Sequence, residues 1–175
     1  MKEINENLDF ENLFKKMKFS KIDFVRGLGI VEDRFELLFE FENERINFEI
    51  ETNFRVRNRN NVLLSFNDLY LDYNRKEMSV RKYRSQTNIE KSYLHKQLEL
   101  LNTILKDAKP KKIITKSYGD VNISFAKDGI VLEILNDTHL ENASLYRIKY
   151  KNAEIIYTYE CNIKNNQLVF NKVNF

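Results

Sequence analysis

The 175-residue sequence has few residues that break or cross-link a chain: one cysteine, one proline, four glycines and no tryptophan. The single cysteine, Cys161, excludes an internal disulfide. So little proline and glycine, beside 42% hydrophobic residues, argues against disorder and for a packed core. No apolar run reaches the roughly 18 residues of a membrane helix. The opening MKEINENLDF carries acids where a secretory signal has basic and then apolar residues, so we expect a cytoplasmic protein with no membrane partner.

Motifs for catalysis are also scarce. The sequence holds two histidines, and it shows no His-x-x-x-His or Cys-x-x-Cys spacing, no Gly-rich phosphate loop and no nucleophile elbow. His139, in a loop with Asp137 and Glu141, is the best-placed candidate for chemistry, yet acidic loops of this kind are ordinary. We therefore expect no enzyme, no cofactor and no catalytic or metal site. An enzyme of unrecognised type stays open and would need a cleft around His139.

One stretch, 87–107, has the pattern of a helix. Thr87 and Glu90 have the spacing of a capping box, which predicts the helix N-terminus. Pro110 disfavours helical geometry just beyond the other end. About twenty residues at about 1.5 Å each give roughly 30 Å, enough to lie across several strands. A weaker pattern at 9–18 predicts a short N-terminal helix. The apolar stripe of the long helix comprises Leu94, Leu98, Leu101 and Leu105.

Apolar and polar residues alternate with period two on both sides of this helix, which predicts strands. The clearest run spans 46–56, about twice the usual strand length, so it is either one long bent strand or two strands that meet at Asn53. Asp128 and Gly129 predict the turn of a hairpin after the helix. With about nine strands in two groups, we predict an α+β fold in which a largely antiparallel sheet, or sheets, packs against the long helix.

The length suits a single domain, 1–175. An alternative organisation has two β-rich halves, 20–72 and 111–175, that are joined by the helix. Both halves contain alternating hairpins, but their identity is too low to separate an internal duplication from the general pattern of amphipathic hairpins.

The first surface with a marked charge is the acidic side of the first predicted hairpin. Like charges on neighbouring strands repel one another unless something relieves them, so these carboxylates are candidates for docking a basic partner. The plain alternative is a solvated sheet face, where glutamates are routine. The residues are Glu36, Glu40, Glu42, Glu49 and Glu51, of which Glu40, Glu49 and Glu51 are our candidate partner-binding residues.

The second surface is basic and aromatic. The net charge of +3 divides into −5 over 1–54 (8 basic, 13 acidic), +9 over 55–116 (15 and 6) and −1 over 117–175 (6 and 7). Tyrosine and arginine dominate protein hot spots and also stack on bases and contact phosphates, so a protein partner and a nucleic acid are both open. The candidates are Arg55, Arg57, Tyr70, Tyr73, Arg81, Tyr83 and Arg84, with Arg59 and Arg75 in the same stretch.

Several hairpin segments between Phe54 and Arg147 share residues with a known group. They are Phe54-Arg55-Val56, Val62-Leu63-Leu64-Ser65, Asp68-Leu69-Tyr70, Tyr118 to Phe125, Gly129 to Ile134, Asn136-Asp137-Thr138 and Tyr146-Arg147. In these residues the chain resembles a loosely defined group of small bacterial α+β proteins found among the immunity genes of polymorphic toxin systems. The resemblance covers just over half of the chain and implies a binding role without assigning catalytic residues.

Together these features predict a non-enzymatic cytoplasmic binding protein, most concretely an immunity protein that neutralises a cognate toxin by covering its active or partner-binding surface. The alternative is a nucleic-acid-binding or phage-encoded regulatory protein that works through the basic middle third. Pairing through an exposed strand edge would also allow a homodimer.

Overall fold

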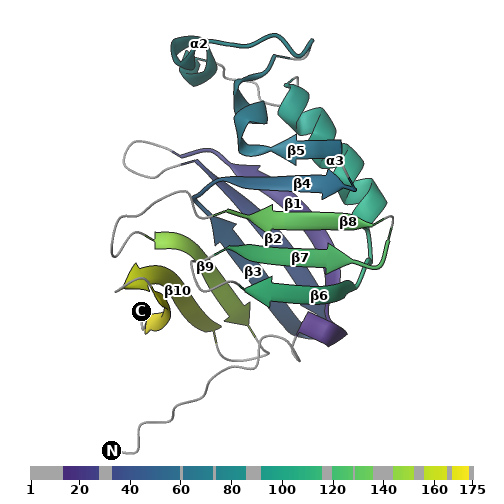
Figure 1. The fold of residues 1–175 in the computed structure, drawn as a ribbon, viewed down its shortest axis with the longest axis vertical. Helices are drawn as coiled ribbons and strands as arrows, with labels where there is room; N and C mark the ends of the chain where they lie inside the picture. Colours follow the sequence, from purple (N-terminus) through teal and green to yellow (C-terminus); the bar gives the residue numbers. More distant parts are fainter. Residues whose placement is uncertain are drawn as a thin grey trace, which may run out of the picture.

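Two antiparallel β-sheets that face each other make up most of the protein, and a helix lies at one side of them in this computed structural model (Figure 1). The α+β class with mostly antiparallel sheets is thereby confirmed. The structure describes residues 14–27, 33–59, 61–72, 74–85, 92–115, 120–127, 129–135, 144–151, 156–164 and 167–173.

The sheets contain six and five strands, and all neighbouring strands are antiparallel. The six-stranded sheet, in the order β1-β2-β3-β9-β10-β11, comprises β1 (Lys18–Val25), β2 (Arg34–Phe41), β3 (Glu44–Ile50), β9 (Ser144–Lys151), β10 (Ile156–Lys164) and β11 (Gln167–Val173). The five-stranded sheet, in the order β5-β4-β8-β7-β6, comprises β5 (Asn61–Ser65), β4 (Phe54–Asn58), β8 (Ile130–Ile134), β7 (Val121–Phe125) and β6 (Pro110–Thr115).

The chain crosses from one sheet to the other between β3 and β4. The alternating run 46–56 is therefore two strands, which is the second of the two alternatives that the sequence left open. The Thr52 hydroxyl donates to the carbonyl oxygen of Leu135 at 3.0 Å, and the Leu135 amide donates to the carbonyl oxygen of Asn53 at 2.8 Å. These two hydrogen bonds fasten the crossing to the end of β8.

Each sheet combines strands from before and after the helix. β3 pairs with β9 in the six-stranded sheet, and β4 pairs with β8 in the five-stranded sheet. The strands of 20–72 and 111–175 are thus interleaved in space and do not form separate sheets, because both groups bury their apolar faces against the same core.

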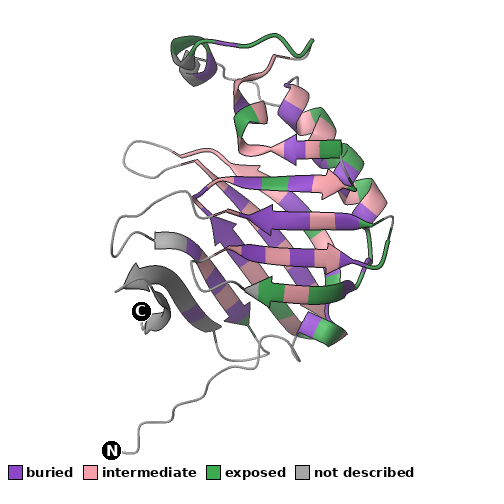
Figure 2. Ribbon diagram, in the orientation of Figure 1, coloured by how far each residue is buried: buried purple, intermediate pink, exposed green. Residues whose placement is uncertain are grey.

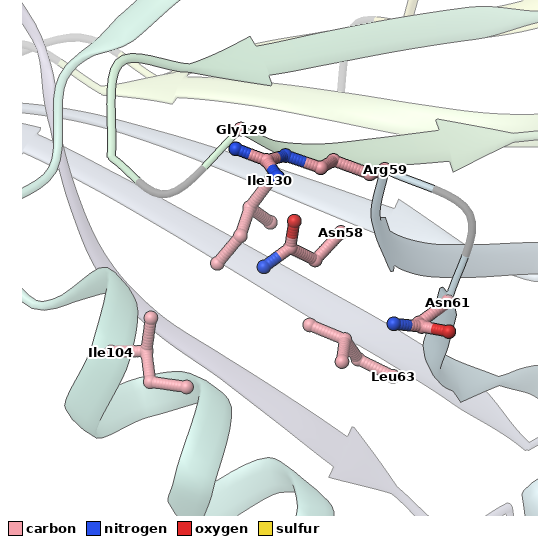
Figure 3. Close-up of a pocket in the computed structure, with 7 residues that line it drawn as sticks. All are labelled: Asn58, Arg59, Asn61, Leu63, Ile104, Gly129 and Ile130. Carbon is pink, nitrogen blue, oxygen red and sulfur yellow. The ribbon is translucent and has the colours of Figure 1, made fainter.

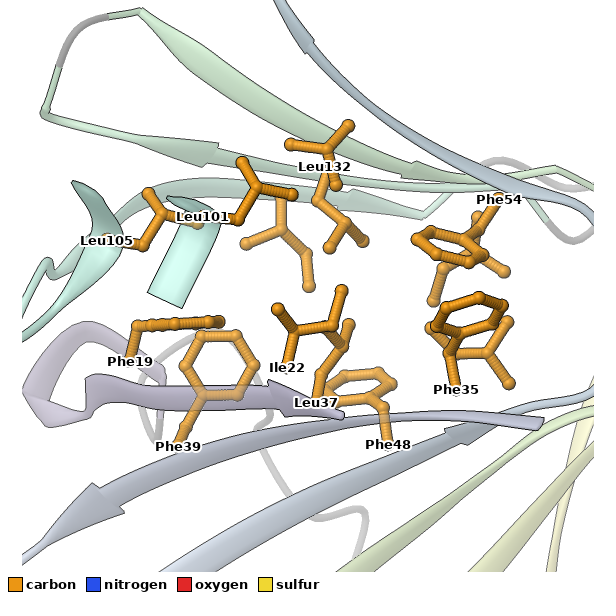
Figure 4. Packing of buried hydrophobic residues seen from close by; sticks show 14 of the residues in the cluster. Phe19, Ile22, Phe35, Leu37, Phe39, Phe48, Phe54, Leu101, Leu105 and Leu132 are labelled. Atoms are coloured by element: carbon orange, nitrogen blue, oxygen red, sulfur yellow. The ribbon is translucent and has the colours of Figure 1, made fainter. Parts of the chain in front are cut away.

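Aromatic and aliphatic side chains from alternate strand positions fill the space between the sheets (Figure 4). The ring centroids of Phe35 and Phe54, from opposite sheets, lie 4.2 Å apart, and those of Phe19 and Phe125 lie 5.8 Å apart, edge to face. Leu101 of the helix closes this core from the side and is fully buried.

The described helices are η1 (Phe66–Tyr70), α2 (Val80–Ser85) and α3 (Tyr93–Leu105), with one helical turn at 14–16. Among the residues covered by the structure, no helix is long and apolar enough to cross a membrane. The predicted helix 9–18 ends early, since Lys18 already belongs to β1; residues 9–13 lie outside the described ranges.

α3 is shorter than the helix predicted over 87–107. Its N-cap is Ser92, whose hydroxyl accepts a hydrogen bond from the His95 amide at 3.1 Å. The start predicted at Thr87 was therefore wrong, because the serine directly before the first turn supplies the cap; residues 86–91 lie outside the described ranges. The buried stripe is as predicted and consists of Leu94, Leu98, Leu101 and Leu105.

The position of α3 also differs from the prediction. The helix does not cover the face of a sheet but contacts β1 and β5, which are edge strands of the two sheets. Thirteen residues at about 1.5 Å give roughly 20 Å, which suits this lateral position. α3 thus closes one side of the two-sheet core and leaves the outer sheet faces uncovered.

Asn102 of α3 fastens the helix to the edge strand β1. The Ile22 amide donates to Asn102 Oδ1 at 2.7 Å, and Asn102 Nδ2 donates to the Ile22 carbonyl oxygen at 3.0 Å. Beyond the helix, the Phe19 amide donates to the carbonyl oxygen of Ala108 at 2.8 Å. These bonds occupy edge groups of β1 that would otherwise be free to pair with another strand.

Candidate functional site on the five-stranded sheet

Two arginines of β4 and one glutamate of β8 meet on the outer face of the five-stranded sheet. Arg55 lies opposite Glu133 in the antiparallel register, and Arg57 is two residues further along, so all three side chains leave the same face. Arg55 Nε donates to Glu133 Oε2 at 2.5 Å, and Arg57 Nε lies 3.0 Å from Glu133 Oε1. One carboxylate therefore holds two guanidinium groups side by side.

The three side chains differ in exposure. The Glu133 side chain is 8% exposed, whereas those of Arg55 and Arg57 are 44% and 34% exposed. Burial raises the pKa of Glu133, but the hydrogen bonds and charges of both arginines outweigh burial and place its pKa below the ordinary value of 4.5. Glu133 is therefore ionised at neutral pH, and the cluster keeps one net positive charge.

The rest of this outer face is open and includes exposed apolar side chains. Val62 is 56% exposed and Ile114 is 38% exposed. Figure 2 shows exposed and half-buried positions alternating with buried ones along these strands. The described residues of the face include three basic side chains against one acidic one and no aromatic ring. The row of Arg57 contains Val62, Val131, Ser124 and Lys112, and the row of Arg55 contains Ser65, Glu133, Asn122 and Ile114.

Arg59 adds another positive charge at the tip of the β4–β5 hairpin. Asn58 pairs with Asn61 at the end of the hairpin, and Arg59, directly after β4, has a positive φ of 51°. Such turns favour asparagine or glycine, and a left-handed arginine costs on the order of 1 kcal/mol. Arg57 Nη1 donates to the Arg59 carbonyl oxygen at 2.9 Å. The Arg59 side chain is exposed, and no described carboxylate pairs with it.

A groove of about 600 Å³ opens beside this turn, between the ends of the hairpins and α3 (Figure 3). Its aliphatic part comes from three elements, β5, α3 and β8, and its polar part from the β4–β5 turn. In Figure 3 the Arg59 side chain extends from its own turn toward Gly129 of the β7–β8 turn. The described lining residues include Leu63, Ile104 and Ile130 on the apolar side and Asn58, Arg59 and Asn61 on the polar side.

Most of the acidic surface predicted from the sequence is paired internally. β9 lies beside β3 and brings its own basic residues next to the glutamates. Of the five predicted glutamates, Glu36, Glu40, Glu49 and Glu51 each pair with a base among the described residues, which relieves much of the expected repulsion within the protein. Glu42 is exposed in the turn between β2 and β3. The pairs are Arg34–Glu36 (3.0 Å), Arg45–Glu40 (2.6 Å), Lys149–Glu49 (2.5 Å) and Arg147–Glu51 (3.0 Å).

Glu49 illustrates what the sequence could not show. It is only 4% exposed, although it belongs to the outer face of its sheet. Its partner Lys149 is 100 residues away in the sequence, so no local pattern reveals the pair. Of the three acidic candidates, Glu40 and Glu51 are half-buried and Glu49 is inaccessible to a partner.

The stretch from Tyr70 to Arg84 packs against the rest of the protein through Tyr83. This tyrosine is 6% exposed, and its ring contacts Tyr70 (centroids 5.3 Å apart) and the Arg26 guanidinium (5.0 Å). Its hydroxyl donates to Asp33 Oδ2 at 2.7 Å, and burial together with this bond raises the pKa of Tyr83. Tyr83 therefore anchors α2 and is not a surface contact.

The other candidates of this stretch differ in position. Arg81 is exposed on α2, and the exposed Arg75 lies over the ring of Tyr93 at 5.1 Å. Tyr73 and the side chain of Arg84 lie outside the described residues.

The residues considered for chemistry are largely outside the described ranges. His139, Asp137 and Glu141 all fall there, and Cys161 lies in β10 opposite Phe170 with its side chain not described. In the ranges that are described, no group of three or more His, Cys, Asp or Glu side chains is placed to hold a metal ion.

The fold and this surface define a class: a two-sheet α+β protein with a basic, partly apolar outer sheet face. Comparison of the chain with protein-family models, with curated proteins and with solved structures found no match.

Proposed function

We propose that the protein is a non-enzymatic cytoplasmic binding protein, and specifically an immunity protein that neutralises a cognate toxin by direct contact. The observation that carries the proposal is the cluster of Arg55, Glu133 and Arg57 on the open face of the five-stranded sheet. The resemblance to toxin-immunity proteins supports the same role, and the cluster lies within the stretch that carries it.

The cluster suits binding because its arginines are positioned before a partner arrives. Arginine side chains lose rotamer freedom when they are immobilised at an interface, and side chains already held by Glu133 lose less. Guanidinium groups form strong paired hydrogen bonds with carboxylates, and arginine is enriched among the residues that dominate binding energy. Val62 and Val131 add apolar area beside them. The surface therefore fits an acidic, partly apolar patch on another protein.

The size of the face limits what it can do alone. Five strands about 4.8 Å apart span about 19 Å, and five residues at about 3.4 Å span about 17 Å. The planar area of roughly 320 Å² is below the accessible surface of about 800 Å² that each partner buries in an interface of standard size. A stable complex therefore has to include elements next to the sheet face.

The proposal is tested with the toxins encoded beside the gene, by calorimetry and by protection of cells. A variant lacking the whole cluster, Arg55→Ala/Arg57→Ala/Glu133→Ala, avoids leaving a buried carboxylate unpaired. We expect the wild-type protein to bind and neutralise one toxin and the triple variant to lose about 100-fold in affinity, since two hot-spot arginines contribute at least tenfold each.

The matched control is Arg45→Ala, which removes an exposed arginine from the opposite sheet. We expect it to bind as the wild-type protein does. Absence of binding and protection with every neighbouring toxin, or equal affinities for the wild-type protein and a folded triple variant, would contradict the proposal.

A nucleic-acid-binding function is the second candidate, and the charge of +9 over residues 55–116 favours it. Binding to phosphates releases counterions, so affinity for DNA or RNA should fall steeply with salt. The described part of the sheet face has no aromatic ring on which bases could stack, which favours a protein partner. Absent or salt-independent binding to both nucleic acids would remove this candidate.

A further inference from the structure

The groove beside the β4–β5 turn combines an aliphatic surface with Arg59, a cation that no described acid pairs with. Leu63 and Ile104 are half-buried, and Ile130 is buried, so apolar side chains are accessible at the groove. Leu100, one helical turn before Ile104 on α3, is 48% exposed and extends this apolar surface. Among the described residues that line the groove, Arg59 is the only charged one.

Arg59 differs from its two neighbours on β4. Arg55 and Arg57 share the carboxylate of Glu133, whereas no described acid pairs with Arg59. Its guanidinium extends across the groove toward Gly129 (Figure 3). A positive side chain in this position is available to a carboxylate that enters the groove together with an apolar group.

The backbone at Arg59 is a second, independent feature. The turn requires a positive φ, which glycine and asparagine adopt more easily than arginine. The protein therefore places an arginine where a turn residue without charge would be more stable. Strained positions cluster at functional sites; Glu42, Arg75 and Asp107 also have a positive φ, and what distinguishes Arg59 is that its strained position lies at the groove.

We propose that this groove binds a short acidic segment of the partner protein, with one apolar side chain between Leu63 and Ile104 and one carboxylate on Arg59. The inference rests on the proposed function and extends it, because the groove supplies contact area that the sheet face alone lacks. The Arg57 hydrogen bond to the Arg59 carbonyl makes the groove continuous with the arginine cluster.

The lining chemistry favours a peptide over a nucleic acid. The apolar part of the groove is aliphatic, so it fits a leucine-like or aromatic side chain but offers no ring to stack on a base. A single arginine lines the described part of the groove and matches one carboxylate, whereas a nucleic acid strand presents a phosphate at every nucleotide. The amides of Asn58 and Asn61 are able to pair with a peptide backbone at the rim.

The test uses methyl NMR of the full chain titrated with the peptide acetyl-Gly-Glu-Leu-Asp-Gly-amide. Two counterparts, one with lysines in place of the acids and one with alanine in place of leucine, separate the charge from the apolar contact. We expect saturable shifts of the Leu63, Ile104 and Ile130 methyl groups with the acidic leucine peptide, and at least about tenfold weaker binding of both counterparts.

Arg59→Gly removes the cation and suits the positive φ, so loss of the fold is not expected to obscure the result. The matched control is Glu42→Gly, at a positive φ of 53° in the two-residue turn between β2 and β3. Both variants should be at least as stable as the wild-type protein. We expect Arg59→Gly to weaken peptide binding about tenfold and Glu42→Gly to leave it unchanged.

Several results would overturn the inference. These are absence of shifts at the three methyl groups, equal binding of the lysine peptide, and stronger shifts with hexathymidylate, which would assign the groove to nucleic acid. If the toxin binds Arg59→Gly as tightly as the wild-type protein but not the variant lacking Arg55 and Arg57, the proposed function stands and the groove proposal fails. Peptide binding in the groove without binding of any toxin would support the groove as a peptide site and contradict the proposed function.

Discussion

Glu133→Gln is the change that tests most sharply whether the buried carboxylate organises the arginine pair. Glutamine keeps the volume but removes the charge, and its amide NH₂ group then faces a guanidinium donor. Each hydrogen bond to a charged group contributes about 1.5–3 kcal/mol when it is well shielded. The side chains of Arg55 and Arg57 are 44% and 34% exposed and rehydrate readily. We therefore expect Glu133→Gln to lower the free energy of unfolding by about 2 kcal/mol in total.

Glu40→Gln is the matched control. Its partner Arg45 lies at 2.6 Å, a similar distance, but the Glu40 side chain is 38% exposed instead of 8%. An exposed pair contributes about 0.2–1 kcal/mol, so this variant should lose less than about 1 kcal/mol. Urea unfolding monitored by circular dichroism measures the loss of unfolding free energy in both variants. Tyrosine fluorescence gives a second probe, because the chain lacks tryptophan.

The pH dependence gives the same prediction an independent readout. Because the folded-state pKa of Glu133 lies below 4.5, its stabilisation is complete above that pH and is lost as the pH falls through the lower folded-state value. The difference in unfolding free energy between the wild-type protein and Glu133→Gln should therefore be constant near neutrality and shrink below pH 4.5. Equal stability at pH 7, or a difference that persists unchanged in acid, would refute this reasoning.

Three further changes test how the helices are held. Tyr83→Phe should lower the free energy of unfolding by about 1–2 kcal/mol because Asp33 loses its hydrogen-bond donor. The pKa of Tyr83 is raised above 10, so this stabilisation is full below pH 10 and is lost at higher pH. An absorbance titration should show one late-ionising phenol in the wild-type protein that is missing from the variant. Asn102→Ala should cost about 1–2 kcal/mol and promote association through β1, seen by sedimentation, because the edge groups of Ile22 lose their partners. Ser92→Ala should cost about 1 kcal/mol in urea unfolding, and an unchanged midpoint would contradict its assignment as N-cap.

The period-two pattern predicted the strands well because it depends only on which face is buried. It could not show that β3 and β4 belong to different sheets. Both sheets bury their inner faces against one core, so the alternation continues in phase from Ile50 through the buried Thr52 to Phe54 while the chain changes sheets. The leucine stripe of α3 was predictable for the same reason, whereas the helix start depended on which of two hydroxyl residues, Thr87 or Ser92, supplies the cap.

The candidate site was predictable in part. Arg55 and Arg57 are two residues apart in an alternating strand, so their common face follows from local sequence. Glu133 was missed because its pairing with Arg55 joins residues 78 apart, and strand register over that distance leaves no local signal. Part of the internal pairing of the acidic face was missed for the same reason, since two of the four bases that pair with its glutamates, Arg147 and Lys149, come from β9.

The most direct test of the central claim is a cross-saturation NMR experiment on the complex with a neighbouring toxin. The protein carries methyl groups on the outer faces of both sheets: Val62, Val131 and Ile114 beside the arginine cluster, and Leu38 on the opposite sheet. If the arginine face contacts the toxin, saturation of the toxin protons should reduce the signals of Val62, Val131 and Ile114 and leave that of Leu38 unchanged. Reduction of the Leu38 signal alone would contradict this contact.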